Sequence, residues 1–199
     1  MIYLIRHGQT EFNREDRFQG RVDSPLTELG IAQARAVGAR LAALVAADPG
    51  DWRIVCSPLG RARHTAEIIA EVAGLAPPQT DERLIEVSYG ALEGLSREEV
   101  DARFPHLAQI KRGVFTVAPE GEPIHDVTAR AADWLAEHDR DDGVRRVAVA
   151  HASIGRVLRG LYGGLDIDAA KLLETPQDAF HRLHGGKVER IDCQLAAQP

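Results

Sequence analysis

The chain has 199 residues, 44% of them hydrophobic, which is enough for one sizeable core, so we expect a single domain over residues 1–199. Its formal net charge of −6 argues against nucleic acid or an acidic membrane surface as a partner, because proteins that bind polyanions normally present a basic face. Two cysteines, no signal-peptide pattern and no apolar run of membrane length favour a cytoplasmic location.

The first part of the chain alternates between buried strands and amphipathic helices. Ile2 to Ile5 is a short apolar run that predicts a strand, and a polar loop follows it as far as Pro25. Thr27 can cap the next helix, which should end before Asp48. The following predicted elements are a strand over residues 52–56 and a helix over residues 61–72.

The second part is less regular before it returns to the same alternation. Residues 84–86 predict a short strand, and Ser96 has capping-box spacing to Glu99. We interpret residues 87–122 as an excursion that forms a lid or pocket wall. The remaining predicted elements are helices over residues 123–138 and 153–162, a strand over residues 147–150 and a hairpin formed by residues 179–183 and 188–191.

This element order predicts an α/β fold, a three-layer sandwich with a mostly parallel sheet, helices on both faces and an antiparallel edge strand. In such sheets ligands bind beyond the carboxyl ends of the strands. Three polar segments follow predicted strands directly, namely Arg6-His7-Gly8, Ser57 to Arg61, and His151. Arginine guanidinium groups and histidine imidazoles that meet at one edge of the sheet favour a site for a phosphoryl group.

The same segments resemble a known family. Leu4 to Thr10, with the order Leu-Ile-Arg-His-Gly-Gln-Thr, is similar to the signature of the histidine phosphatase superfamily, the phosphoglycerate mutase-like family. Further matches follow in family order along nearly the whole chain. They are Asn13, Gln19-Gly20, Pro25 to Gly30, Ser57 to Ala62, Thr65-Ala66, Leu84 to Glu86, Gly90, Glu93-Gly94, Pro119 to Glu122 and Val149 to His151.

The resemblance implies a phosphomonoesterase that acts through a phosphohistidine. In that reading His7 is the nucleophile and Glu86 exchanges protons with the leaving group and with water. Arg6, Arg61 and His151 would bind the nonbridging oxygens and stabilise their charge. The substrate would be a small phosphorylated metabolite.

The resemblance also implies supporting roles and no cofactor or metal. Asn13 would assist in binding the phosphoryl group, Gln19 and Gly20 would belong to the binding loop, and the Gly8 carbonyl would accept the other ring proton of His7. One departure is Ala152, where the family commonly has glycine, and its small methyl group should have a modest effect. Pro123 stands where the family often has serine, and it still suits a helix start.

Each of these residues also has a plain structural interpretation. Taken alone, Arg6 or Arg61 would be a surface cation, Glu86 a solvated carboxylate, and His7 or His151 a half-buried histidine with satisfied hydrogen bonds. Only their joint order along the chain favours catalysis. We expect four further histidines to be structural or surface residues. Two of them, His181 and His184, should point to opposite sides of a strand, which is poor geometry for a metal. Those four histidines are His125, His138, His181 and His184.

Three other functions remain open. A cysteine-dependent phosphatase could use Cys56 and Arg61, although four residues between them are one fewer than that family's loop requires. A phosphoglycerate mutase of this family has a longer segment between the acid and the second histidine. A phospholigand-binding regulatory module would usually have lost His7 or Glu86.

Substrate selectivity should come from groups around the phosphate site. The loop with Arg17, Phe18, Arg21 and Val22, the pair Ser88-Tyr89, and an excursion with Lys111, Arg112 and Phe115 carry the candidate groups. Lys111 and Arg112 could contact a second anionic group or could form a solvated basic pair. The sequence leaves a homodimer open.

Overall fold

The computed structural model of the protein describes residues 1–107 and 118–195 and has a six-stranded sheet in the order β3-β2-β4-β1-β5-β6. The strands β1 to β4 are parallel, and β5 and β6 form an antiparallel hairpin at one edge. Their bounds are β1 Ile2–Arg6, β2 Asp51–Cys56, β3 Gln79–Thr80, β4 Val144–Ala150, β5 Ala179–His184 and β6 Lys187–Asp192. The prediction of a mostly parallel α/β sheet with an antiparallel edge is confirmed.

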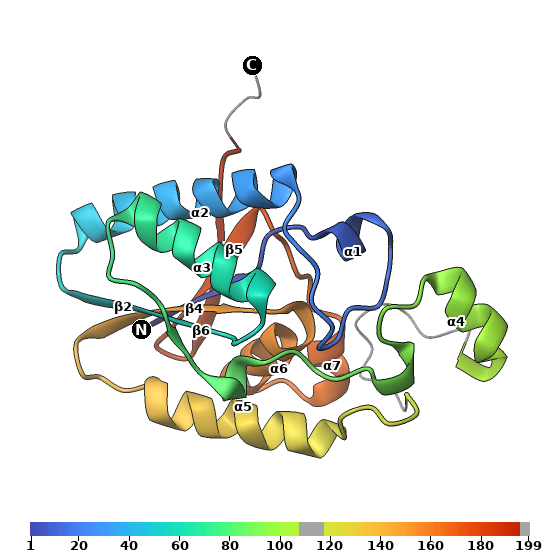
Figure 1. Cartoon of the computed structure of the whole chain (residues 1–199). Coiled ribbons are helices and arrows are strands. Elements are labelled where there is room, and N and C mark those ends of the chain that lie inside the picture. Colours follow the sequence, from blue (N-terminus) through green and yellow to red (C-terminus); the bar gives the residue numbers. More distant parts are fainter. Residues whose placement is uncertain (108–117, 196–199) are drawn as a thin grey trace.

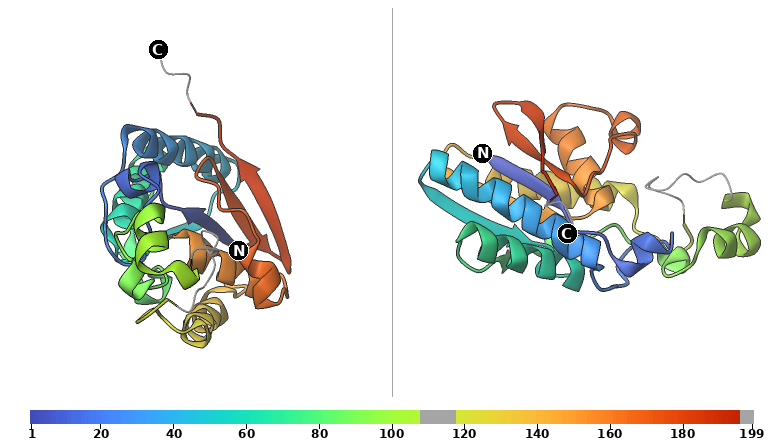
Figure 2. Two further views of the ribbon diagram at one scale, coloured as in Figure 1. Left: turned by 90° about the vertical axis from the view of Figure 1, so that its right-hand side faces the viewer. Right: turned by 90° about the horizontal axis from the view of Figure 1, so that it is seen from above.

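Helices cover both faces of this sheet (Figure 1). On one face lie α2 (Glu28–Ala47) and α3 (Gly60–Ala73), which pack against each other along their length. On the other face lie α5 (Ile124–His138), α6 (Ala152–Tyr162) and the short α7 (Ile167–Lys171). The three layers are also visible when the molecule is turned (Figure 2).

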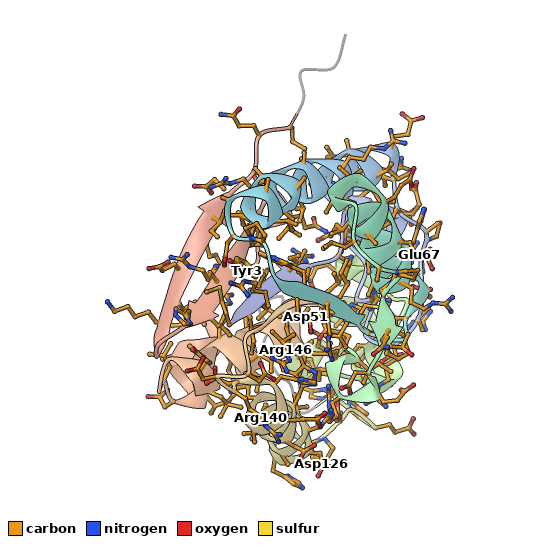
Figure 3. All side chains as sticks on the ribbon, turned by 90° about the vertical axis from the view of Figure 1, so that its left-hand side faces the viewer. Tyr3, Asp51, Glu67, Asp126, Arg140 and Arg146 are labelled. Carbon is orange, nitrogen blue, oxygen red and sulfur yellow. The ribbon has the colours of Figure 1, made fainter. Side chains whose placement is uncertain are left out.

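The central strands are apolar on both sides because both faces of the sheet are covered. In β1, Tyr3 and Ile5 pack with α2 and α3, whereas Ile2 and Leu4 pack with α5 and α6. The Tyr3 ring stacks on Trp52 of β2 with 5.1 Å between the ring centroids. Figure 3 labels Tyr3 on the side of the sheet that faces α2. Burial on both faces explains why these strands can be read as continuous apolar runs.

Local capping sets the helix boundaries. The Thr27 hydroxyl accepts a hydrogen bond from the Gly30 amide at 3.0 Å, which caps α2 as expected. α3 ends at Gly74, whose φ of 67° is a left-handed conformation that favours glycine. By length and composition α2 could cross a membrane, but Val37 and Leu41 on its inner side belong to the core beneath it.

Two local expectations differ from the structure. The predicted strand at residues 84–86 is wrong: Leu84 ends a 3₁₀ turn, Glu82–Leu84, because the Asp81 carboxylate accepts the Arg83 amide at 2.9 Å and caps that turn. The polar loop before Pro25 contains a one-turn helix, α1 (Glu11–Arg14), in which Thr10 and Asn13 form a capping box.

The described residues of the excursion that we placed at residues 87–122 lie beyond the end of the sheet, near α1 (Figures 1 and 2). Its described part contains 3₁₀ turns at Gly90–Leu92 and Pro105–Leu107 and the helix α4 (Arg97–Arg103), which Ser96 caps as the spacing predicted. A separate apolar cluster joins this part to Phe18 of the first loop. Lys111, Arg112 and Phe115 lie outside the described residues.

Candidate active site

Two histidines lie side by side where the central strands β1 and β4 end. The β-sheet pairing continues into the site, since the His7 amide donates to the Ala150 carbonyl at 3.0 Å. His7 and His151 are 3% and 1% exposed, and their ring centroids are 5.1 Å apart. The parallel topology therefore brings together residues that are distant in the sequence.

The His7 ring is held in one tautomer. Its Nδ1 lies 2.7 Å from the Gly8 carbonyl oxygen, which can only accept, so Nδ1 carries the proton and Nε2 holds the lone pair. Burial, followed by the Arg61 and Arg6 guanidiniums, holds the pKa of His7 well below the ordinary value of 6.5. The imidazole is consequently neutral near pH 7, with a nucleophilic nitrogen.

Gly8 is required by close packing against α2. A Cβ on Gly8 would lie 2.3 Å from the carbonyl oxygen of Gly30, which is backbone and cannot move aside. The Gly8 amide donates to the Thr65 hydroxyl at 3.1 Å. These contacts fix the backbone that presents the His7 ring.

Arg61 lies in the first turn of α3 and is buried beside the second histidine. Its Nε donates to Nδ1 of His151 at 3.2 Å, so Nε2 of His151 carries the proton, and it donates to the Ser57 hydroxyl at 2.7 Å. Burial, followed by Arg61 and His7, holds the pKa of His151 well below 6.5. In this structure both ring nitrogens of His151 are thus engaged by protein groups.

Carbonyls of the first loop aim the Arg61 guanidinium. Its Nη2 donates to the Gly20 oxygen at 2.7 Å and its Nη1 to the Val22 oxygen at 2.9 Å. Gly20 has a φ of 53°, and a Cβ there would lie 2.2 Å from the Glu93 carboxylate. Gly20 therefore serves the site by positioning Arg61.

Two further side chains line the cavity: Arg6, which precedes His7 in the sequence, and Asn13, which follows it. Arg6 is anchored through Nη1, which donates to the Thr175 carbonyl at 2.6 Å. The Asn13 Oδ1 accepts from the Thr10 amide at 3.2 Å, which directs its amide group. The Gln19 side chain donates to the Thr10 hydroxyl, so Gln19 is tied to the capping box of α1.

Glu86 caps a helix that begins next to His151. Its carboxylate accepts the amides of Ser153 and Ile154, each at 3.0 Å, and its own neighbour Val87 at 2.9 Å. His151 is the N-cap residue of α6 but makes no side-chain cap, so Glu86 satisfies these amides instead. The acid and the second histidine are therefore fixed by the same helix turn.

These groups surround a polar cavity of about 260 Å³. Seven of the predicted site residues line it: Arg6, His7, Asn13, Gln19, Gly20, Arg61 and Glu86. His151 lies behind this cavity, bound to Arg61 and Ser57, and borders a much smaller one. Arg17, Phe18 and Tyr89, which we proposed for selectivity, also line the main cavity, whereas Arg21, Val22 and Ser88 do not.

Sequence reasoning missed three residues of the cavity wall: Ala152 as a lining group, Arg156 and Thr175. Arg156 follows Ala152 by one helical turn of α6, so the helical period would have placed both on the same side. Nothing in the sequence around Thr175 indicates its position, because the contact with Arg6 joins opposite ends of the chain.

Cys56 is not part of this cavity. Its side chain is fully buried among α2 and α3 residues, and burial raises the pKa of its thiol to about 11. A thiol in that state is a poor nucleophile. The structure thus disfavours the cysteine-dependent reading. Over residues 1–107 and 118–195, no group of three or more potential metal ligands is present, and His181 contacts Arg159 at 2.9 Å.

The pH dependence of phosphomonoester hydrolysis, the activity that the sequence resemblance implies, offers a test of the His7 environment. We expect the acidic limb of kcat/KM to lie well below pH 6.5, because protonation of Nε2 removes the attacking lone pair. Arg61→Met should move this limb toward neutral pH, since the guanidinium opposes formation of the imidazolium. Profiles of kcat/KM against pH, with the same substrate throughout, measure it.

Arg61→Lys is the matched control, since it keeps the positive charge and should keep the limb near its wild-type position. If the acidic limb of kcat/KM lay at the same pH in wild type, Arg61→Met and Arg61→Lys, the electrostatic account would be contradicted.

A neutral imidazole facing a cavity lined with arginines and a carboxylate, at the carboxyl end of a parallel sheet, is an arrangement suited to binding a phosphoryl group. The model of the histidine phosphatase superfamily (branch 1) matches residues 2–189, and the chain belongs to that family. The resemblance seen in the sequence is thereby confirmed.

Named relatives point to two activities within the family. A probable phosphoglycerate mutase, GpmB, of Shigella boydii is 36% identical over 200 residues, covering 97% of this chain and 85% of the relative. The mycobacterial glucosyl-3-phosphoglycerate phosphatase Rv2419c, solved with VO₃, is 30% identical with a TM-score of 0.78, covering 98% of both chains. Bacillus stearothermophilus YhfR is 29% identical with a TM-score of 0.78, covering 96% of this chain and 95% of that one.

Proposed function

We propose that the protein is a phosphomonoester hydrolase that forms a phosphohistidine on His7 and acts on a small phosphorylated metabolite. The observation that carries the proposal is the state of His7: its Nδ1 is bound to the Gly8 carbonyl and its pKa is lowered, so Nε2 is a neutral nucleophile. The polar cavity beside it, about 260 Å³, suits a small and hydrophilic substrate.

In the first step Nε2 of His7 attacks phosphorus, a P–N bond forms, and the bond to the ester oxygen breaks. The leaving oxygen takes up a proton carried by the Glu86 carboxyl group, which regains one from water in the second step, and the alcohol departs. Arg6 and Arg61 bind the nonbridging oxygens, and Asn13 turns its Nδ2 toward them. His151 accepts a hydrogen bond from Arg61 at Nδ1, and its Nε2–H group exchanges its hydrogen bond with the Ser57 hydroxyl for one with a phosphoryl oxygen.

In the second step water attacks the phosphohistidine. Glu86 takes a proton from that water, the P–N bond breaks, and inorganic phosphate leaves with His7 neutral again. The charges that stabilise both transition states come from the arginines, so the proposal requires no metal ion.

Hydrolysis of an aryl phosphate with and without chelator tests this proposal. We expect turnover that chelator does not change, together with an acid-labile phosphoenzyme trapped by rapid quench. Loss of turnover with chelator would contradict the metal-independent mechanism. No turnover and no phosphoenzyme would favour a phospholigand-binding module.

Phosphoglycerate mutase is the second candidate, favoured by the name of the 36% identical relative. The phosphatase of known structure matches this chain over 98% of both lengths, whereas the chain covers 85% of the mutase-named relative, and we therefore prefer hydrolysis. Following 2-phosphoglycerate by NMR, primed with bisphosphoglycerate, separates the two. Interconversion to 3-phosphoglycerate faster than phosphate release would overturn our choice.

A cytoplasmic location belongs to the same proposal. It is supported by Cys56 and Cys193, which are both free thiols in the structure, as a reducing compartment would keep them.

A further inference from the structure

The peptide unit between His7 and Gly8 is bound on both of its edges. Its N–H group, on Gly8, donates to the Thr65 hydroxyl at 3.1 Å. Its carbonyl, on His7, accepts from the Gln177 side-chain Nε2 at 3.0 Å. The Thr65 hydroxyl donates its own hydrogen bond to the Arg61 carbonyl at 2.7 Å, so it accepts the Gly8 amide through a lone pair. The plane that carries the nucleophile is therefore fixed from α3 and from a segment after α7.

The same Gln177 nitrogen also contacts Asn13, whose Oδ1 it approaches to 3.3 Å. An amide NH₂ has two protons, which allows both bonds at once. With Oδ1 bound to Gln177 and to the Thr10 amide, the Asn13 amide has one remaining donor group, Nδ2. Asn13 lines the cavity, so this donor is the part that can meet a phosphoryl oxygen.

The segment that carries Gln177 is itself held by three buried or half-buried arginines. They bind three successive backbone carbonyls: Arg156 binds that of Leu173 at 2.6 Å, Arg159 that of Glu174, and Arg6 that of Thr175 at 2.6 Å. Arg159 is only 5% exposed. A segment fixed in this way presents Gln177 with little freedom, although it has no regular secondary structure.

We propose that Gln177 is a positioning residue for phosphoryl transfer: its amide holds the His7 carbonyl and the Asn13 side chain in register with each other. This inference rests on the proposed function, since it assigns Gln177 to the formation of the phosphohistidine. Its physical basis is that a displacement of about 1 Å at the reacting atoms costs roughly 100-fold in rate.

Two variants separate positioning from simple loss of bulk. Gln177→Ala removes both bonds, and we expect phosphoenzyme formation to slow by roughly 10- to 100-fold. Gln177→Glu keeps the size but places carboxylate oxygens against two acceptors, the His7 carbonyl and Asn13 Oδ1, and should slow it further. Leu172→Ala is the matched control, because Leu172 is 82% exposed in the same stretch of chain.

The experiment is a rapid-quench measurement of the phosphoenzyme and the aryl alcohol burst with p-nitrophenyl phosphate. Wild type and Leu172→Ala should behave alike, with slower bursts for Gln177→Ala and Gln177→Glu. ¹⁵N NMR of the His7 ring gives a second readout independent of turnover: wild type should show one tautomer, protonated at Nδ1, and Gln177→Ala a mixture.

Each outcome is decisive. A wild-type burst with unchanged bursts and tautomers in both Gln177 variants would overturn the positioning role and leave the proposed function intact. If wild type formed no phosphoenzyme, the proposed function and this inference would both fall. If one of the two Gln177 variants failed to fold, the other would carry the test. A melting temperature equal to that of wild type shows that a slower burst does not come from unfolding.

Discussion

Replacing His7 by alanine is expected to abolish turnover, with kcat falling by roughly 10⁴-fold or more, and to leave no acid-labile phosphoenzyme. The reason is chemical, since among the described residues no other side chain that lines the cavity carries a neutral nitrogen lone pair. His151 cannot substitute, because its Nδ1 is bound by Arg61 and its Nε2 carries a proton. Steady-state kinetics and rapid quench measure both effects.

Cys56→Ser is the control for His7→Ala and should retain most activity, measured well below the melting temperature of the variant. The Cys56 side chain is fully buried in the core beneath α3, away from the cavity. If Cys56→Ser lost activity while His7→Ala kept it, the assignment of the nucleophile would be wrong.

Glu86→Gln is expected to have the second largest effect, and its size should depend on the leaving group. For an alkyl phosphate, whose leaving oxygen needs a proton, we expect kcat/KM to fall by roughly 10²- to 10⁴-fold. For p-nitrophenyl phosphate, whose leaving group departs without protonation, the loss should be much smaller. Comparing the two substrates in wild type and variant measures the difference.

Glu82→Gln, four residues before Glu86, is the matched control because Glu82 is exposed and lies outside the cavity lining. It should leave both substrates unaffected. Equal losses on the alkyl and aryl substrates in Glu86→Gln would show that Glu86 acts by capping α6 and not by transferring a proton.

The sequence could predict the sheet because its central strands are short apolar runs buried on both faces, as Tyr3 and Ile5 on one side of β1 and Ile2 and Leu4 on the other illustrate. Helix starts could be predicted where a side chain caps them, as at Thr27. The one-turn helices α1 and α7 are too short for a helical period to emerge.

The site could be predicted only in part. His7 and His151 directly follow predicted strands, so the topology alone brings them together. Glu86 was recognisable only through its position in the family order, because it lies in a loop where the sequence had suggested a strand. Gln177 was not predictable, since its bond to the His7 carbonyl spans 170 positions and has no local pattern.

The place of β1 in the sheet has a consequence for how the protein forms in the cell. Within the described residues this first strand pairs with β4 and β5 alone, and both of those lie in the last third of the chain. During synthesis on the ribosome, the apolar side chains of β1 therefore remain without these partner strands for on the order of ten seconds, until β4 and β5 have been made. Folding of the nascent chain should accordingly begin elsewhere, with α2 and α3, and a chaperone that shields β1 as it leaves the ribosome should raise the yield of folded protein.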